Sequence, residues 1–332
     1  MSLLSIPSHE SILSARKRLA GTILNTPLIR FESCRHDFCQ FGETEVDTIP
    51  EIYLKLENLQ PTGSFKVRGA GNALLSADPS KLQNGVWTAS AGNMGQALAW
   101  YARKLNIACT VVVPDNAPEV KVQAIQSLGA EIINVPFSEY QSIQKESKHP
   151  EMKGLLIHPF ADEAVMAGNG TIGFEIMEDL PDADTILVPY GGGGLSCGIA
   201  SSLRSSKSSG ASVEAVEIAT AIPLTESLAA GKMMEVPYRS SFVSGMGAPF
   251  IFPQMWGLAG KLLAGSRVVE LTQVAKAIRL LAERHHIIVE GAGAVALAAA
   301  LRMNENKKLV CVVSGGNISA AHLNKILHGE LP

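Results

Sequence analysis

The sequence has little charge and few aromatic side chains for its length. Of 332 residues, 18% are charged and 5% are aromatic, and the formal net charge is −3. A charge so near balance gives no sign of a surface for nucleic acid or for an anionic membrane. Apolar residues are abundant instead, at 46%, and 30 residues are glycine. This composition suits one or two filled cores built on a buried parallel sheet with many tight loops.

Cysteine is scarce, and no long apolar run is present. An odd, scattered set of thiols indicates free cysteines in a reducing compartment. Two of them share a polar segment but lack a second ligand pair, which disfavours a zinc site there. The first residues lack the basic and apolar regions of a signal peptide, and no apolar stretch of membrane-spanning length escapes polar interruption. We therefore expect a cytoplasmic protein. The cysteines are Cys34, Cys39, Cys109, Cys197 and Cys311.

Short apolar segments alternate with helical ones along most of the chain. This alternation, with continuously apolar strands, predicts an α/β fold whose parallel sheets are covered on both faces. A polar, irregular stretch over 33–50 predicts a surface loop. The predicted strands are 52–56, 86–89, 109–113, 132–135, 155–158, 185–189, 213–216 and 309–313. The predicted helices are 11–24, 95–105, 118–128, 195–204, 273–284 and 292–303.

One lysine stands in a crowded turn before an apolar helix. The segment 61–70 reads Pro-Thr-Gly-Ser-Phe-Lys-Val-Arg-Gly-Ala, with Lys66 directly after Phe65. If it is buried, desolvation lowers the pKa of the amine, which makes it a usable nucleophile toward an aldehyde. Small residues before it let the backbone approach a ligand closely. The competing interpretation is a solvated lysine at a helix start.

Two strands end in loops suited to anions. The strand 185–189 leads into four consecutive glycines, Gly191, Gly192, Gly193 and Gly194, and then Leu195 opens a helix. Their backbone N–H groups and the helix N-terminus form a phosphate cradle without a nucleotide fingerprint, which suits a small phosphorylated cofactor. The alternative is a tight turn. The strand 86–89 leads into a second candidate loop that suits a substrate carboxylate, or else an ordinary N-cap. That loop contains Ser90, Ala91, Gly92, Asn93 and Met94.

Other motifs divide into one candidate and two false leads. Ser314 follows the strand 309–313, where its hydroxyl can meet a ring nitrogen in the same crevice. The segment 168–173 matches G-x-G-x-x-G but follows no strand, and 291–296 has no acidic residue at the required distance. A dinucleotide-binding oxidoreductase is therefore disfavoured. His285 and His286 have no partners for metal ligation and favour a helix end.

Taken together, these segments resemble the fold-type II pyridoxal-phosphate (PLP) enzymes, in the serine/threonine dehydratase and serine racemase branch. The resemblance extends from Thr26 through Gln60 and the lysine turn to Asn317. It implies a tryptophan synthase β-like fold of two α/β domains, each a mainly parallel sheet with helices on both faces. The larger domain would comprise 1–80 and 160–332, and the smaller 81–159 would be inserted in it. A homodimer acting on a small hydroxyamino acid is also implied.

The resemblance assigns roles by position. Lys66 would carry PLP as a Schiff base, beside Phe65. The cofactor phosphate would lie on Gly191–Gly194 and Leu195, and Ser314 would meet the pyridine nitrogen. Asn93 and Glu290 would lie near the cofactor ring. The substrate carboxylate would be surrounded by Ser90, Ala91, Gly92, Asn93 and Met94.

The resemblance also implies a reaction. Positions at which this sequence departs from the family pattern favour one of the family's reactions over the others. Lys66 would remove the Cα proton, the β-hydroxyl would leave, and hydrolysis would give a 2-oxo acid and ammonia. Ala91 replaces the serine of racemases, which favours dehydration over racemisation. Val67 replaces the aspartate of β-replacement enzymes. Of the family's cation ligands, Glu217 and Ala221 match, but Pro223 replaces the aspartate, so we expect no confident metal site. A PLP-binding protein without turnover remains an alternative.

Overall fold

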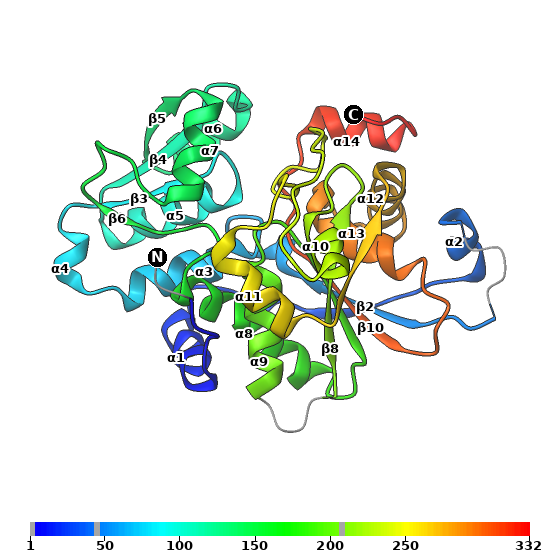
Figure 1. Cartoon of the computed structure of the whole chain (residues 1–332). Helices are drawn as coiled ribbons and strands as arrows, with labels where there is room; N and C mark the ends of the chain where they lie inside the picture. The colour runs from blue at the N-terminus through cyan, green and yellow to red at the C-terminus, as the bar shows by residue number, and fades with distance from the viewer. Residues whose placement is uncertain (1–3, 43–46, 206–209) are drawn as a thin grey trace.

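The computed structural model describes residues 4–42, 47–205 and 210–332. Its strands form two separate sheets (Figure 1). The large sheet has the order β1-β2-β10-β7-β8-β9 and the small sheet the order β5-β4-β3-β6. All neighbours pair in parallel except β1 with β2. The large sheet consists of β1 (Leu28–Phe31), β2 (Glu51–Leu56), β7 (Thr185–Pro189), β8 (Ser212–Ile218), β9 (Gly265–Val269) and β10 (Lys308–Val313). The small sheet consists of β3 (Val86–Ala89), β4 (Cys109–Pro114), β5 (Glu131–Val135) and β6 (Leu155–Leu156).

Helices surround both sheets. The first group lies before or within the small-sheet region: α1 (His9–Leu19), α2 (Arg35–Gln40), the 3-10 helix η1 (Glu57–Leu59), α3 (Lys66–Ser76), α4 (Pro79–Leu82), α5 (Asn93–Leu105), α6 (Glu119–Ser127) and α7 (Phe137–Glu146). The second group follows it: α8 (Glu163–Asp179), α9 (Gly194–Ser205), α10 (Pro223–Ala230), α11 (Pro253–Leu262), α12 (Leu271–His285), α13 (Gly291–Ala300) and α14 (Ala320–Leu327).

The large sheet separates two hydrophobic cores because side chains of a strand alternate between its faces. On β10, Leu309, Cys311 and Val313 pack with α12 and α13, whereas Val310 and Val312 pack with α8, α9 and α11. Figure 1 shows α8, α9 and α11 together on one side of this sheet and α12 and α13 on the other. Both faces are therefore covered, as continuously apolar parallel strands require.

The small sheet follows the same rule on a smaller scale. Val111 and Val113 of β4 pack toward α5 and α6, and Val112 packs on the opposite face with Trp87 and Ile143. We call this sheet with α4 to α7 the small lobe; it lies at the upper left of Figure 1. The chain enters it after α3 and leaves it before α8, so the lobe is an excursion from the large-sheet part.

The strand–helix alternation predicted from the sequence is confirmed, and one element is corrected. Every predicted strand is present; β3 and β7 have the predicted ends, the others have shifted ends, and β1 and β9 are additional. The stretch 33–50 is not wholly a surface loop: it contains α2, and Phe38 and Phe41 are buried in the large core. Two buried phenylalanines in an otherwise polar segment do not produce a helical periodicity of apolar residues, so the sequence did not predict α2.

The first false dinucleotide motif serves helix packing. The glycines of 168–173 lie inside α8, where a Cβ at Gly168 would be 2.4 Å from the carbonyl oxygen of Arg68 and one at Gly170 would be 2.8 Å from that of Gly198. They let α8 approach α3 and α9 closely. Within the described ranges, no helix is long and apolar enough to cross a membrane, and no group of three or more His, Cys, Asp or Glu side chains is placed to hold a metal.

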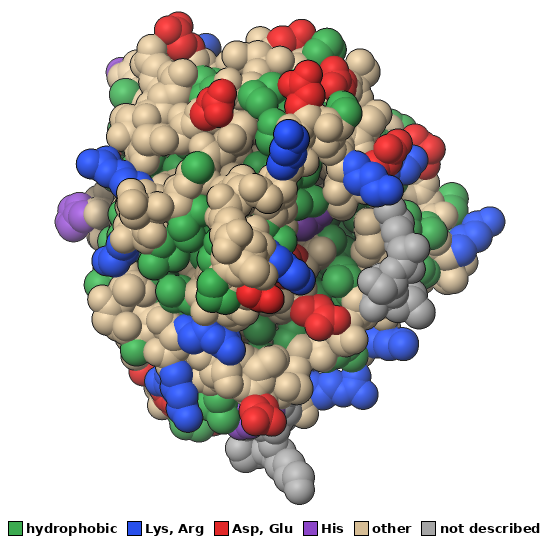
Figure 2. Space-filling model, turned by 90° about the vertical axis from the view of Figure 1, so that its left-hand side faces the viewer, with side chains coloured by type: hydrophobic (Ala, Val, Ile, Leu, Met, Phe, Trp, Pro, Cys, Tyr) green, Lys and Arg blue, Asp and Glu red, His purple; other side chains and the backbone are tan. Residues whose placement is uncertain are grey.

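The surface agrees with the balanced composition. On the face shown in Figure 2, Lys and Arg side chains are interspersed with Asp and Glu. All five cysteines are free thiols; Cys34 and Cys39 are exposed and the other three are buried.

Candidate active site

The loops singled out in the sequence meet between the two sheets. The turn before Lys66 is held by the end of β10: the amide of Phe65 donates to the carbonyl of Ser314 at 3.0 Å, and Gly316 donates to Gly63 at 2.8 Å. Residues 64 and 315 form an isolated antiparallel bridge. Carboxyl ends of parallel strands lie at one edge of a sheet, so the loops after β7 and β10 open to the same crevice.

Lys66 is the first residue of α3, and its amine is buried rather than solvated. Nζ lies 5.0 Å from the centroid of the Phe65 ring and donates a 2.6 Å hydrogen bond to the carbonyl of Pro159. Burial lowers the pKa of the amine to about 8, although the charge of Glu290 opposes this shift. A desolvated amine of lowered pKa is partly neutral near physiological pH and can attack an aldehyde.

The start of α3 is fixed by a buried ionic network that the sequence did not reveal. Arg68 is fully buried and forms bidentate bonds to Glu57, at 2.7 and 2.8 Å, and to Glu175, at 2.6 and 2.8 Å. Lys55 adds an ion pair of 2.7 Å with Glu175. The guanidinium thus ties α3 to η1 and α8 two residues beyond Lys66. Buried charges of this kind persist only when they are paired and hydrogen-bonded.

The glycine loop is a tight cradle for which glycine is required. A Cβ at Gly192 would lie 2.2 Å from the Phe160 ring, and one at Gly194 would lie 2.7 Å from the Phe160 Cα. Gly193 has a φ of +87°. Among the described residues, the amides of Gly191 to Gly193 have no hydrogen-bond acceptor. Unpaired N–H groups that precede a helix N-terminus form a site for an anion.

Ser314 and Asn93, two polar residues predicted for the site, differ in their hydrogen bonding. Among the described residues, the hydroxyl of Ser314 makes no hydrogen bond, although only 3% of the residue is exposed. Asn93, at the start of α5, donates to Glu290 Oε1 at 2.6 Å and accepts from Asn317 at 2.8 Å. Burial raises the pKa of Glu290 to about 7, against the opposing effects of Asn93, Lys121 and Lys66. These contacts join the small lobe to the end of β10 and the start of α13.

The loop after β3 is shaped by the side chain of Ser90 and is open near Gly92. Ser90 accepts a hydrogen bond from the amide of Gly92 at 3.3 Å, so its hydroxyl helps to shape the turn. A Cβ at Gly92 would meet nothing within 4 Å, and Ala91 is only half-buried, so this part of the loop faces open space. Met94 is different: its side chain is 1% exposed and packs in the small-lobe core. Only the backbone of Met94 remains to meet a ligand.

The positions that match the family's cation ligands have another use. The Glu217 carboxylate accepts from the amides of Leu224 and Thr225 at 2.9 and 2.8 Å and from the hydroxyls of Thr225 and Ser266 at 2.7 and 3.1 Å. It therefore caps the first turn of α10 from a neighbouring strand. Pro223 begins that helix, and Ala221 is buried beside it. A cation does not fit this donor set.

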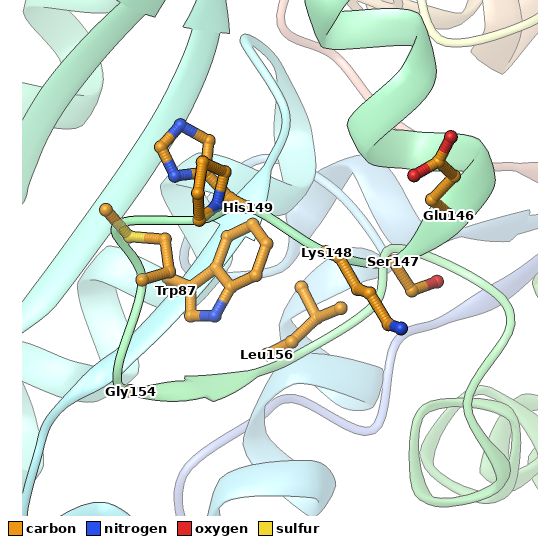
Figure 3. Close-up of a pocket in the computed structure, with 9 residues that line it drawn as sticks. Trp87, Glu146, Ser147, Lys148, His149, Gly154 and Leu156 are labelled. Atoms are coloured by element: carbon orange, nitrogen blue, oxygen red, sulfur yellow. The ribbon is translucent and has the colours of Figure 1, made fainter.

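A separate cavity lies in the small lobe. It encloses about 540 Å³ between β3, β6 and the segment 146–154. Trp87, His149 and Leu156 line it, as Figure 3 shows, and none of its lining residues belongs to the predicted site. We assign no role to it.

The crevice between the sheets fits PLP. The partly buried amine of Lys66, a cradle of unpaired amides and the hydroxyl of the buried residue Ser314 correspond to the aldehyde, the phosphate and the ring nitrogen of that molecule. Sequence reasoning had singled out these three elements. It did not predict the roles of Arg68, Pro159 and Lys121. Arg68 is a buried charge, and Pro159 and Lys121 make contacts between distant segments; neither feature has a local signal in the sequence.

Comparisons with known proteins agree with this geometry. The family model described as pyridoxal-phosphate dependent enzyme matches residues 19–315. The chain is 40% identical to an L-threonine ammonia-lyase of Geobacter sulfurreducens, over 84% of this chain and 70% of that protein. It is 34% identical to a catabolic L-threonine dehydratase of Escherichia coli, over 96% and 95%.

Solved structures support the same assignment. A maize serine racemase superposes with a TM-score of 0.84 at 30% identity, covering 98% of both chains. A threonine deaminase of Solanum lycopersicum superposes with a TM-score of 0.82 at 26% identity, covering 99% of this chain and 92% of that one. The family match and these relatives establish that the chain belongs to the pyridoxal-phosphate-dependent enzymes, is a lyase of the fold-type II class, and uses pyridoxal phosphate as its cofactor.

Proposed function

We propose that the protein is an ammonia-lyase that converts a hydroxyamino acid, such as L-threonine or L-serine, to a 2-oxo acid and ammonia. The observation that carries the proposal is the partly buried amine of Lys66, with a pKa of about 8, near the two loops that we propose to bind the phosphate and the substrate carboxylate. Relatives named as L-threonine ammonia-lyases and dehydratases support this substrate class.

The residues would divide the work of binding. The amides of Gly191 to Gly194 and Leu195 would hold the phosphate, and Phe65 and Asn93 would bound the ring. Ser314 would hydrogen-bond the ring nitrogen, and Glu290 would orient Asn93 through their 2.6 Å contact. The loop from Ser90 to Met94 would receive the substrate carboxylate. Gly92 faces open space, so a substrate can approach its backbone.

The chemistry follows from these positions. When bound, the cofactor would supply an electron sink for the charge that develops at Cα. Lys66, as a neutral amine in a partly buried site, would take the proton from Cα and hold it at Nζ. The β-hydroxyl would leave with a proton as water, and the released enamine would be hydrolysed to the 2-oxo acid and ammonia. Ser314 presents a neutral hydroxyl, which would not enforce protonation of the ring nitrogen as a carboxylate would. Loss of the β-hydroxyl would therefore be favoured over slow return of a proton to Cα.

The second candidate is a racemase, because serine racemases are among the similar structures. A racemase needs a second acid–base group on the far face of the cofactor. Ala91 has no such group, which favours elimination. A β-replacement reaction is disfavoured by Val67, and a non-catalytic role by the simultaneous presence of Lys66, Ser90 and Ser314.

Three organisational features belong to the proposal as well. We expect a homodimer in the cytoplasm. We divide the chain into a cofactor domain of 1–80 and 160–332 and an inserted domain of 81–159. This division follows the separation of the two sheets, because β3 to β6 lie within the inserted segment. Scattering or ultracentrifugation of the pure protein tests the dimer.

The function is tested by measuring 2-oxo acid release. Purified protein with PLP is given L- and D-hydroxyamino acids, including serine, threonine and 3-hydroxyaspartate, beside Lys66→Ala. Turnover of one substrate that is lost in this variant supports the proposal and identifies the substrate. Interconversion of enantiomers without 2-oxo acid supports a racemase instead. Ala91→Ser then tests whether the missing hydroxyl controls the outcome, because it should add measurable racemisation.

A further inference from the structure

A second lysine crosses the crevice and is not used by the proposed chemistry. Lys121 lies in the first turn of α6 in the small lobe, and its Nζ donates a 2.6 Å hydrogen bond to Ser244 Oγ. Ser244 belongs to the loop between α10 and α11, on the large-sheet side. The amine is partly buried, and burial lowers its pKa, while the charge of Glu290 opposes that shift.

The segment that contains Ser244 lies directly on the cofactor cradle. A Cβ at Gly191 would be 2.7 Å from the carbonyl oxygen of Gly245, so the two backbones are in contact. A Cβ at Gly291 would be 2.9 Å from Val243 Cα. Residues 243–245 are thus packed between the glycine loop and the start of α13. A displacement of Ser244 would move the backbone that covers the cradle.

The helix that carries Lys121, α6, is itself packed closely against α5. Ile125 of α6 packs on Gly95, where a Cβ would lie 2.8 Å from its Cδ1. Gly95 follows Asn93 and Met94 in the first turn of α5. α6 is therefore fixed against the loop proposed for the substrate carboxylate. Lys121 therefore projects from a helix that packs against this loop, and it contacts Ser244 on the large-sheet side of the crevice.

We propose that Lys121 is a positioning residue that, through Ser244, holds the 243–245 segment on the glycine loop and closes the small lobe over cofactor and substrate. It acts together with the contacts that Asn93 makes with Glu290 and Asn317, which also join the lobe to the opposite wall. Neither atom of the Lys121–Ser244 pair takes part in proton transfer. The inference rests on the proposed function only for its substrate readout.

The size of the effect follows from the nature of the bond. A hydrogen bond from a charged donor in a partly buried site changes an equilibrium constant by about tenfold or more. Lys121→Met and Ser244→Ala should each raise the cofactor dissociation rate and KM by about tenfold, with a smaller change in kcat. The double variant should be no worse than either single one, since both remove the same contact.

The experiment measures release of PLP from each purified holoenzyme after dilution, by its absorbance and fluorescence. KM and kcat are measured on the substrate identified above. Lys81→Met is the control, because Lys81 is exposed in the same lobe. Lys121→Arg keeps a charged donor and should restore retention, and Ser244→Asp should slow release because it creates an ion pair.

Three outcomes would overturn the inference. One is unchanged PLP release and KM in Lys121→Met. Another is a double variant whose effects multiply, which would show that the two side chains act independently. The third is a lower unfolding temperature of the apoprotein without faster release, which would indicate a merely structural role. If the wild type turns over no hydroxyamino acid, the proposed function fails, whereas the release rates still decide the role of Lys121.

Discussion

The amine of Lys66 lies 2.6 Å from the carbonyl oxygen of Pro159, and it makes no other hydrogen bond or ion pair within the described residues. A carbonyl oxygen can accept a hydrogen bond from the ammonium group but cannot neutralise its charge. The ammonium form is therefore poorly compensated, and burial lowers its pKa to about 8.

The first prediction concerns the reactivity of this amine. Because the neutral form attacks aldehydes, the rate of PLP incorporation into apoprotein should rise with pH and level off above about 8, well before the ordinary lysine value of 10.5. Stopped-flow absorbance measures this rate, and Lys66→Ala should incorporate no cofactor covalently. A rate that continues to rise to pH 10 would contradict a lowered pKa.

The second prediction concerns Glu290, whose pKa is raised to about 7 by burial. Between pH 4.5 and 7 the folded protein binds this proton more tightly than the unfolded chain. The free energy of unfolding should therefore fall across that window, by on the order of 2–3 kcal/mol from this group. Glu290→Gln keeps an acceptor for Asn93 and should remove this part of the pH dependence. Urea unfolding of apoprotein at pH 5 and pH 8 measures the difference, and equal pH dependence in both proteins would refute it.

A third prediction tests the buried guanidinium. Arg68→Met leaves Glu57 and Glu175 buried without their main partner, which should destabilise the protein by roughly 3–5 kcal/mol. Arg68→Lys should recover only part of this loss, because one ammonium cannot form two bidentate pairs. Arg35→Met, at an exposed arginine, serves as control and should change stability by about 0.5 kcal/mol or less. The measurement is denaturant unfolding of each variant, and a loss in Arg68→Met no larger than in the control would contradict a paired, stabilising role.

The fourth prediction compares two glycines that both lie in helices. Gly194→Ala places a methyl group 2.7 Å from the Phe160 Cα, whereas Gly257→Ala meets nothing within 4 Å. The first should cost about 1–3 kcal/mol and weaken PLP binding at least tenfold, because the cradle must shift. The second should leave both properties nearly unchanged. Cofactor titration followed by fluorescence separates the two, and similar affinities would show that the cradle tolerates a side chain.

The fifth prediction concerns divalent cations. The Glu217 carboxylate is occupied by two amides and two hydroxyls, so a chelator should leave activity and melting temperature unchanged. Glu217→Ala should instead lower stability by about 1–3 kcal/mol, because the first turn of α10 loses its acceptor. The two assays are turnover with EDTA and thermal unfolding. Activation by Mg²⁺ or Ca²⁺ of more than about twofold would contradict this interpretation of the site.

Sequence reasoning can reach residues whose signal is local. The glycine loop, Lys66 and Ser314 each follow or precede an apolar strand or helix, and their neighbours in sequence define the turn. It failed where the signal depends on packing. Arg68 looks like any charged residue at a helix start until α8 and η1 enclose it. Phe38 and Phe41 look isolated until the large core surrounds them.

The same distinction applies within the carboxylate loop. Polar character and spacing identified the loop after β3, and the structure places it at the crevice. Which side of α5 faces the small-lobe core depends on how α5 packs on β4 and α6. The side chain of Met94, which was predicted to meet the substrate, consequently packs in the small-lobe core. The contact between Lys121 and Ser244 gave no signal in the sequence, because 123 residues separate the two.

The hydrogen bonds between the residues after β10 and the turn before Lys66 affect the order in which the protein folds and binds its cofactor during synthesis. Ser314 and Gly316 fix the backbone on either side of residue 64, about 250 residues upstream. A nascent chain can form the small lobe while this turn is still unsupported, but the two halves of the large sheet are joined only when β10, which lies between β2 and β7, has been made. Stable cofactor capture then becomes one of the last events of synthesis, so PLP retained by the protein reports that the chain has been completed through residue 316.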